Sequence, residues 1–455
     1  NIFGRLANFL SLHTLKYGLK KPTVIIGASS HRCDSVVNKS LGQDSLIQVI
    51  SMPGLNRIKK PEYSSFLFLL KIIKLSGLYF LGIKSSYGVC YEFDFYPFKQ
   101  LAQDDRTNKF NQFFTDVRKT GIIKHDLLNL LERKTIEGIN PLLGTLENVG
   151  NVLKEVFRKS KPIGFVTPHS LNGTQLLGDL SLELGIPGVL ISHGSHSVPQ
   201  NSEIENELKR HGLGLIHSNF DHVAIQSPLA RNYLEYFNIE RKNVPTGPLL
   251  WGTRFSDKEV IEKKEKFVIT HAGSQKPRES LRFLFYETTD EYVKSILSLV
   301  NAVKGMDEIE CIIRFRPTNS LTLETLREII PEQRNVKISA EGPFLEVLAK
   351  TDLLVSYSST TMEEAIENRI PVLQYSLDNR FTFLPSVTLS NEEETCFSPV
   401  YSIDPNLTLR DGLAMIVKLS KDTKNKEDYY KEYSIPANER TEIKHLIEAW
   451  CQAKE

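Results

Sequence analysis

Short apolar runs that end in small or polar residues alternate along this chain with longer segments of helical periodicity. This alternation predicts strand–helix–strand units and therefore parallel sheets in an α/β fold. In parallel sheets, ligands bind beyond the carboxyl ends of the strands, so the loops after these runs are the places to search for chemistry. The predicted strands are Thr23–Ile26, Ile163–Val166, Gly188–Ile191, Val223–Ile225, Phe267–Thr270, Cys311–Arg314, Val336–Ile338, Leu353–Val355 and Val372–Gln374.

The chain has 455 residues, and a domain built on a single hydrophobic core is usually shorter than this. A Pro- and Gly-rich segment, Val244–Gly252, is followed by the charged stretch Ser256–Lys266 and predicts an interdomain linker. We expect two Rossmann-like domains, residues 1–250 and 251–437, that face a central cleft. A terminal helix within residues 438–455 is expected to pack back on the N-terminal domain.

Charge is distributed unevenly along the chain. Residues 1–161 hold 24 Lys and Arg against 13 Asp and Glu, a formal charge of +11, whereas the whole chain carries +1. An anionic acceptor or membrane surface would suit this basic pole, and a merely solvated face is the alternative.

The apolar, lysine-containing stretch 63–84 is either a core helix or an interfacial helix. No nucleic-acid-binding motif occurs, so nucleic acid is not an expected partner.

The five cysteines form no metal-binding pattern, and no apolar run approaches the roughly 18–20 residues that span a bilayer. We therefore expect no metal and no cofactor. We expect a cytoplasmic protein, with peripheral contact to the inner face of the cytoplasmic membrane left open.

Histidines follow two neighbouring predicted strands of the N-terminal half. His169 follows the strand Ile163–Val166, and the segment Ser-His-Gly-Ser-His, which contains His193 and His196, follows Gly188–Ile191. A histidine beside glycine at a strand end is well placed as a general base, and its near-neutral pKa suits proton removal from a hydroxyl. We predict His193 as the base and assign acceptor binding to His169, His196, Ser29 and Arg32.

The first predicted strand of the C-terminal half leads into the sequence Thr-His-Ala-Gly-Ser-Gln-Lys, which begins at Thr270. Small residues and backbone N–H groups at a strand-to-helix turn can cradle phosphate, with lysine supplying charge. A charged surface loop would look similar. The donor-binding residues expected here are His271, Gly273, Ser274 and Lys276.

Two further segments suit a donor phosphate. Arg314 and Arg316 alternate in Arg-Phe-Arg-Pro after an apolar strand, and guanidinium groups pair bidentately with phosphate. The hydroxyl-rich run 358–361 precedes a predicted helix, where free N–H groups and the helix dipole favour anions. We predict donor binding by Ser358, Ser359 and Thr360, and ribose binding by Glu363.

These motifs resemble the GT-B glycosyltransferase superfamily, in particular the surface-polysaccharide branch that includes CDP-glycerol glycerophosphotransferases and capsular Kdo and sialic acid transferases. The matching residues are Ser192-His193-Gly194, Arg314-Phe315-Arg316-Pro317 and Tyr357-Ser358-Ser359, and the resemblance covers roughly residues 160–375. It implies an inverting, metal-independent glycosyltransferase that builds a bacterial surface glycan such as a capsule or lipopolysaccharide. It also implies a nucleotide-sugar donor, with a CMP-linked acidic sugar favoured over a UDP-sugar, and a glycan or glycolipid acceptor.

One departure from this family concerns the donor site: Arg316 stands where the family has histidine, and arginine cannot donate a proton to a leaving group. The alternatives are a UDP-GlcNAc 2-epimerase-like enzyme, a CDP-polyol phosphotransferase and a non-catalytic nucleotide-binding protein. Thr270 and His271 resemble the Thr-His-Arg motif of the epimerases, but the Arg-x-Glu-Asn that follows in that family is absent. If His193 is structural, Glu92 and Asp94 are the competing bases.

Overall fold

The computed structural model describes most of the chain between residues 103 and 453 and short parts of the N-terminal hundred residues. The described residues are 22–27, 36–37, 39–41, 47–51, 103–171, 173–192, 194, 196–251, 265–273, 275, 286–318, 320–378, 380–392, 395–422 and 426–453. Ser29, Arg32, His193, Ser274 and Lys276 lie outside this set, as do the alternative bases Glu92 and Asp94 and the stretch 63–84. Their predicted roles stay predictions.

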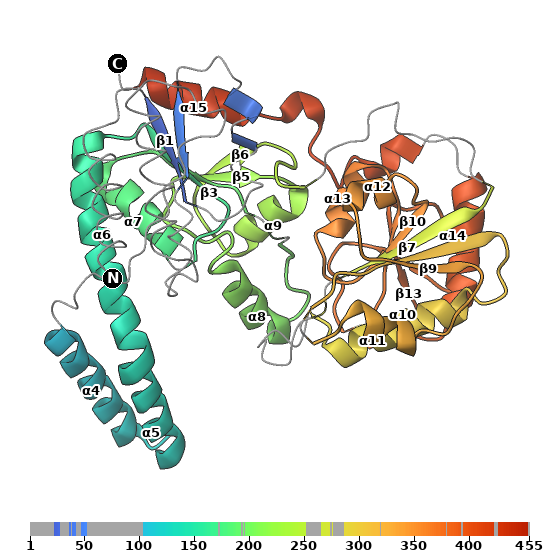
Figure 1. Ribbon diagram of the computed structural model, residues 1–455, viewed down its shortest axis with the longest axis horizontal. Coiled ribbons are helices and arrows are strands. Elements are labelled where there is room, and N and C mark those ends of the chain that lie inside the picture. Colours follow the sequence, from blue (N-terminus) through green and yellow to red (C-terminus); the bar gives the residue numbers. More distant parts are fainter. Residues whose placement is uncertain are drawn as a thin grey trace. The chain divides into compact units, whose positions relative to one another are not determined.

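Within the described residues, the strands form two sheets (Figure 1). The first has the order β2-β1-β3-β4-β5-β6, and the second has the order β12-β13-β11-β10-β7-β8-β9. The first sheet consists of β1 Thr23–Ile26, β2 Gln48–Ser51, β3 Gly164–Thr167, β4 Gly188–Leu190, β5 His222–Ile225 and β6 Lys242–Pro245. The second consists of β7 Phe267–Ala272, β8 Ile309–Arg314, β9 Val336–Ser339, β10 Leu353–Ser356, β11 Val372–Gln374, β12 Val387–Leu389 and β13 Val400–Ile403.

Neighbouring strands run parallel in both sheets, as in the pairs β1–β3, β3–β4, β7–β10 and β7–β8. Helices connect them, so the predicted α/β class with two parallel sheets is confirmed. The central cleft and the domain boundaries near residues 250 and 437 stay predictions.

The helices of the first part of the chain are α4 Gln103–Thr120, α5 His125–Lys134, the π-helix η2 Thr135–Ile139, α6 Asn140–Ser160, α7 Gly173–Leu184, α8 Ser202–Gly212 and α9 Pro228–Tyr236. Those of the second part are α10 Thr289–Ala302, α11 Leu323–Ile329, α12 Phe344–Leu348, α13 Thr361–Glu367, α14 Leu409–Asp422, the 3₁₀ turns η3 Lys426–Tyr430 and η4 Ala437–Glu439, and α15 Ile443–Gln452. None of the helices in the described part of the chain is both long and apolar enough to cross a membrane.

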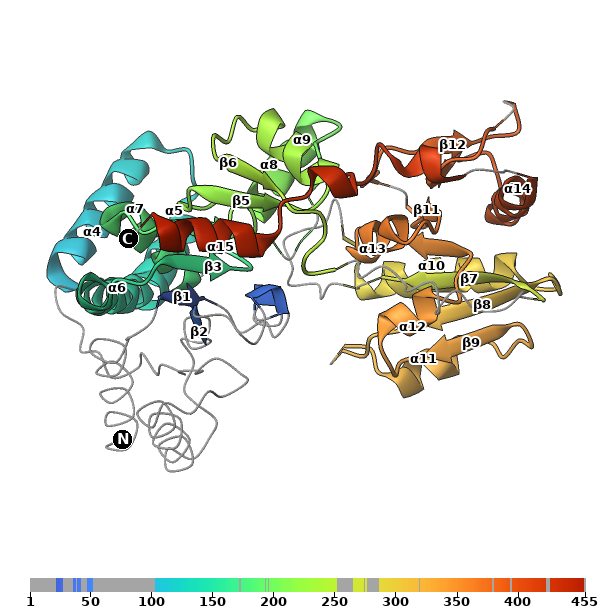
Figure 2. The ribbon, with the colours of Figure 1, turned by 90° about the horizontal axis from the view of Figure 1, so that it is seen from above.

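The chain divides into two compact units. The first comprises residues 1–192, 213–223 and 442–455, and the second comprises 193–212 and 224–441. In the first unit, α15 lies beside strands of the first sheet (Figures 1 and 2). A Cβ atom on Gly164 of β3 would lie 2.2 Å from Cε3 of Trp450, so only glycine permits this approach of the indole.

The second sheet is covered on both faces, which is typical of parallel sheets. Side chains of β10 alternate between two apolar clusters: Leu353 and Val355 join Ile269 and residues of α10 and α14, whereas Leu354 joins residues of α13. The core therefore fixes the central strands β10, β7 and β8 from both sides. The loops that leave their carboxyl ends start from a rigid platform.

Candidate functional site

Three adjacent strands of the second sheet bring most of the predicted donor-binding residues to one edge. Val355 of β10 pairs with His271 of β7, and His271 pairs with Ile313 of β8. Because the strands are parallel, the loops after them leave from the same edge of the sheet. Gly273, Arg316 and the hydroxyl-rich turn before α13 therefore lie at the carboxyl edge of β7, β8 and β10 respectively.

His271 is a deeply buried ionisable group at this edge. Its ring is 2% exposed and lies 5.4 Å from the ring of Tyr292 on α10. Burial lowers the pKa of His271 to about 4, so the imidazole is neutral at pH 7. The Nδ1 atom is buried and has no hydrogen-bond partner among the described residues. A buried polar atom of this kind costs free energy until a ligand supplies the missing bond.

Gln275 adds a second buried atom of the same kind. The side chain is 7% exposed, and its Nε2 donates a 2.7 Å hydrogen bond to Oγ1 of Thr318 after β8. That bond orients the amide and leaves Oε1 buried without a partner. Nothing in the local sequence indicates a role for Gln275, because a glutamine in a charged loop is normally solvent-exposed.

The turn between β10 and α13 holds the predicted hydroxyl groups. Ser358 is buried, and its backbone adopts a left-handed conformation with φ of 46°, which residues other than glycine rarely adopt. Oγ of Ser359 accepts a hydrogen bond of 3.3 Å from the backbone N–H of Thr361. Thr360 occupies the N-cap position, but its side chain makes no capping bond. The hydroxyl-rich run therefore lies at the start of a helix, as the sequence predicts, and its donor-binding role stays a prediction.

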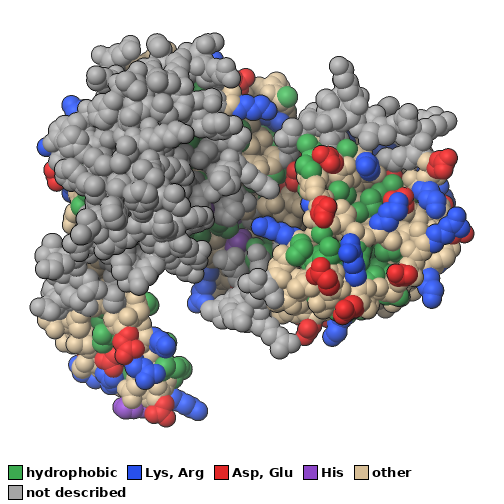
Figure 3. All heavy atoms as spheres, viewed as in Figure 1, with side chains coloured by type: hydrophobic (Ala, Val, Ile, Leu, Met, Phe, Trp, Pro, Cys, Tyr) green, Lys and Arg blue, Asp and Glu red, His purple; other side chains and the backbone are tan. Residues whose placement is uncertain are grey.

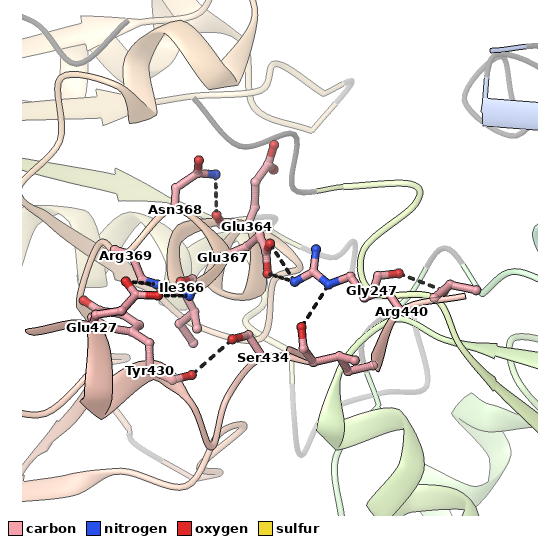
Figure 4. A network of polar contacts seen from close by, with 12 residues as sticks. Gly247, Glu364, Ile366, Glu367, Asn368, Arg369, Glu427, Tyr430, Ser434 and Arg440 are labelled. Atoms are coloured by element: carbon pink, nitrogen blue, oxygen red, sulfur yellow. Dashed lines mark hydrogen bonds and ion pairs between the residues drawn. The ribbon is translucent and has the colours of Figure 1, made fainter. Parts of the chain in front are cut away.

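Glu363 lies in the first turn of α13 and is buried, with 7% of the residue exposed. The far end of the same helix is tied down by an ion pair, because Nη2 of Arg440 lies 2.9 Å from Oε1 and 3.1 Å from Oε2 of Glu367 (Figure 4). Nε of Arg440 also donates to the carbonyl of Ile435. The helix that starts at the hydroxyl-rich turn is therefore held at its end.

The two predicted arginines differ in their surroundings. The guanidinium of Arg314 donates to two backbone carbonyls, at 3.2 Å to Ser339 and 2.5 Å to Gly342. Arg316 is exposed beyond the end of β8. The donor contact predicted for Arg314 stays a prediction, and Arg316 is the better placed of the two for an incoming anion.

A buried carboxyl group precedes α10, the helix that carries Tyr292. Glu287, just before α10, is 4% exposed and accepts a 2.6 Å hydrogen bond from Ser295. Burial raises the pKa of Glu287 to about 7. Burial and, to a smaller extent, the negative charge of Glu287 raise the pKa of Tyr292, whose ring is tilted by 58° against that of His271. The sequence analysis missed this group because nothing local distinguishes it from a helix-capping acid.

The histidines of the N-terminal half have other surroundings. Nδ1 of His169, after β3, lies 3.1 Å from Oγ1 of Thr174 at the start of α7. The ring of His196 is buried, 5.3 Å from Tyr233 and 6.4 Å from His211. His169 belongs to the first compact unit and His196 to the second. Their acceptor-binding roles stay predictions.

No protein-family model matches this chain, and no curated protein matches it. Several solved structures are similar in fold. They include a UDP-GlcNAc 2-epimerase from Neisseria meningitidis, with 12% identity over 95% of this chain and 98% of that chain and a TM-score of 0.45. A UDP-GlcNAc 2-epimerase from Methanocaldococcus jannaschii has 12% identity over 94% of this chain and 99% of that chain, with a TM-score of 0.47. A UDP-glucosyltransferase from Polygonum tinctorium has 11% identity over 95% of this chain and 99% of that chain, with a TM-score of 0.45. At these identities and scores, the likeness assigns no activity to this chain.

Proposed function

We propose that this chain is a glycosyltransferase whose nucleotide-sugar donor binds at the carboxyl edge of β8, β7 and β10. The observation that carries the proposal is the pair of buried, unpartnered atoms at this edge, Nδ1 of His271 and Oε1 of Gln275. His271 lies on β7, and Gln275 lies three residues after the end of this strand, where Thr318 holds its amide group.

The chemistry of these two atoms favours a hydroxyl-bearing ligand. An amide oxygen accepts hydrogen bonds, and a neutral imidazole nitrogen accepts or donates according to its tautomer, so a hydroxyl group, which does both, can satisfy either atom. Sugar and ribose hydroxyl groups donate such bonds, whereas phosphate oxygens at neutral pH mainly accept them. The pair therefore supports recognition of the sugar or the ribose.

Other residues at the same edge are candidates for binding the phosphate groups of the donor. Arg316 supplies a permanent, exposed positive charge, and the turn 358–360 supplies hydroxyl groups at the N-terminus of α13, although the N–H of Thr361 is already bonded to Ser359. We assign the donor phosphate to Arg316 and this turn, and the ribose hydroxyls to Glu363. A cation that cannot release a proton would stabilise the departing nucleotide by charge alone.

For the transfer itself, we propose that His193 removes the proton of the acceptor hydroxyl as that oxygen attacks the anomeric carbon with inversion. Glu92 and Asp94 remain the competing bases. A CMP-linked acidic sugar is the favoured donor within the surface-polysaccharide branch, and a UDP-sugar is the next choice.

A second candidate function is a UDP-GlcNAc 2-epimerase-like activity. It is favoured by one observation, the burial and neutrality of His271 directly after Thr270 on β7. The two activities differ in their need for an acceptor. An epimerase interconverts the free nucleotide-sugar, whereas a transferase consumes it only when an acceptor is present.

The donor assignment is tested by thermal unfolding of the full chain with CMP, CDP, UDP and GDP, because a ligand that binds only the native state raises Tm as its concentration exceeds Kd. We expect one nucleotide to raise Tm in the wild type and to lose much of this effect in Gln275→Ala. Stabilisation by UDP, but not by CMP or CDP, would overturn the CMP preference. If no nucleotide or nucleotide-sugar raises Tm, the proposed function fails.

A further inference from the structure

The helices α4 and α5 form a hairpin in the first unit (Figures 1 and 2). Apolar side chains lie on two sides of α5. One side faces α4. Leu128 is buried there, and Arg118 of α4 donates a 3.1 Å hydrogen bond to Asn129 and pairs with Glu132. These contacts fix the orientation of α5 about its own axis.

The opposite side of α5 is an apolar stripe open to solvent. Leu127, Leu130 and Leu131 are 51%, 42% and 42% exposed, and their spacing of three and four residues places them on one helical face. Ile122, in the turn that precedes α5, is 84% exposed. Isolated exposed leucines are ordinary, but a stripe of this kind on a helix marks an interaction surface.

The charges around the stripe are basic. Lys134 lies seven residues after Leu127 on the same face, and Lys124 borders the stripe at the other end of α5. Two acidic side chains of the hairpin are engaged elsewhere: Asp116 pairs with Lys119, and Glu132 pairs with Arg118. Asp126 is exposed and, at about 100° per residue, lies on the flank of the stripe, one turn before Leu130.

We propose that this stripe, Ile122, Leu127, Leu130 and Leu131 with Lys124 and Lys134, lies on an anionic lipid bilayer. An interfacial helix buries leucines at the headgroup boundary while lysines at its rim contact anionic lipid. The overall charge of +11 on residues 1–161 favours the same surface. Figure 3 shows hydrophobic, basic and acidic side chains together on the hairpin, at the lower left.

A second copy of the chain is a poorer occupant of the stripe. In a two-fold interface the same face meets itself, so the lysines of one copy would approach those of the other. No acidic side chain of α5 lies within the stripe to neutralise them. Anionic headgroups complement these charges, whereas a second stripe repeats them.

The experiment is flotation of the full chain with phosphatidylcholine vesicles that contain 0% or about 30% phosphatidylglycerol, a range in which each lysine near the surface contributes measurably. The wild type should bind the anionic vesicles more tightly. The triple variant Leu127→Gln, Leu130→Gln, Leu131→Gln should lose about tenfold or more in partitioning, because its apolar contact is removed. Leu182→Gln, at a position on α7 that is 74% exposed, is the matched control and should bind as the wild type does.

A second variant, Lys124→Glu with Lys134→Glu, should lose the preference for anionic vesicles. This variant tests the proposal if the triple leucine variant does not fold. Far-UV circular dichroism and urea unfolding check the fold of both. Absence of wild-type binding, or binding unchanged in both variants, overturns the proposal. So does a dimer, seen by light scattering, that the triple variant dissociates while no vesicle is bound.

Discussion

The carboxyl edges of the two sheets differ in how their polar groups are satisfied. After β3 in the first sheet, the Thr167 hydroxyl bonds with backbone carbonyls, and His169 pairs with Thr174. After β7 in the second sheet, His271 and Gln275 keep buried atoms without partners. Among the described residues, these polar groups after β3 are paired within the chain, whereas Nδ1 of His271 and Oε1 of Gln275 are available to a ligand.

The largest effect is expected from the ion pair that holds α13. Arg440→Ala should lower the free energy of unfolding by about 3–5 kcal/mol, because it leaves the nearly buried Glu367 carboxylate without its cation. Urea unfolding measures this loss. The control Arg369→Ala breaks a pair with Glu427, which is 63% exposed, and should cost about 1 kcal/mol or less. Equal losses in the two variants would mean that α13 is not specially anchored.

His271 and Glu287, two buried titratable groups of the second unit, should make the free energy of unfolding depend on pH in opposite directions. His271 has a pKa of about 4 in the folded chain and 6.5 as its ordinary value. In this window the unfolded chain binds the extra proton, so the contribution of His271 to stability is lost as pH falls from 6.5 towards 4. Glu287 has a pKa of about 7 against an ordinary 4.5, and the folded chain binds the extra proton. Its contribution is therefore lost as pH rises from 4.5 towards 7.

Between pH 4.5 and 6.5 these two slopes nearly cancel in the wild type. Relative to the wild type, the unfolding free energy of His271→Phe should fall with rising pH by about 1.4 kcal/mol per unit, and that of Glu287→Gln should rise by a similar amount. Urea unfolding at half-unit steps of pH measures both. Difference slopes of the same sign would contradict the burial of one of the two groups.

A smaller effect, on nucleotide affinity, is expected from the exposed guanidinium group of Arg316. Arg316→Ala should weaken nucleotide binding roughly 10- to 100-fold, since a hydrogen bond to a charged group contributes about 1.5–3 kcal/mol. Isothermal titration at two salt concentrations measures the affinity. Arg327→Ala, another exposed arginine of the second unit, is the control and should bind as the wild type does. If both variants lose affinity equally, general positive charge rather than Arg316 attracts the phosphate.

The smallest effect tests the two edges directly. Gln275→Ala should weaken binding of the nucleotide-sugar about fivefold, as expected for one neutral hydrogen bond of about 1 kcal/mol. His169→Ala, at the edge of the first sheet, should leave nucleotide affinity unchanged. Competition titration with a labelled nucleotide resolves the difference. A larger loss in His169→Ala than in Gln275→Ala would reverse the comparison between the edges.

The sequence located most strands of both sheets, since an apolar run bounded by polar residues must be buried wherever it lies. The strands that it missed include β2, β6 and β12 at the margins of the sheets. β6 and β12 are partly exposed, so they carry no continuous apolar run to reveal them. The missed strand β13 is fully buried, but it is short and follows Ser398 and Pro399.

For the candidate site, the sequence by itself determined which loops follow strands, and it therefore indicated His271, Arg316 and the turn 358–360. Only the tertiary structure decided which of their polar atoms remain unpaired. Gln275 is oriented by Thr318, 43 residues away, and Arg314 is engaged by carbonyls 25 and 28 residues away. Strand position follows from local hydrophobicity, whereas hydrogen-bond satisfaction depends on partners that only folding brings within reach.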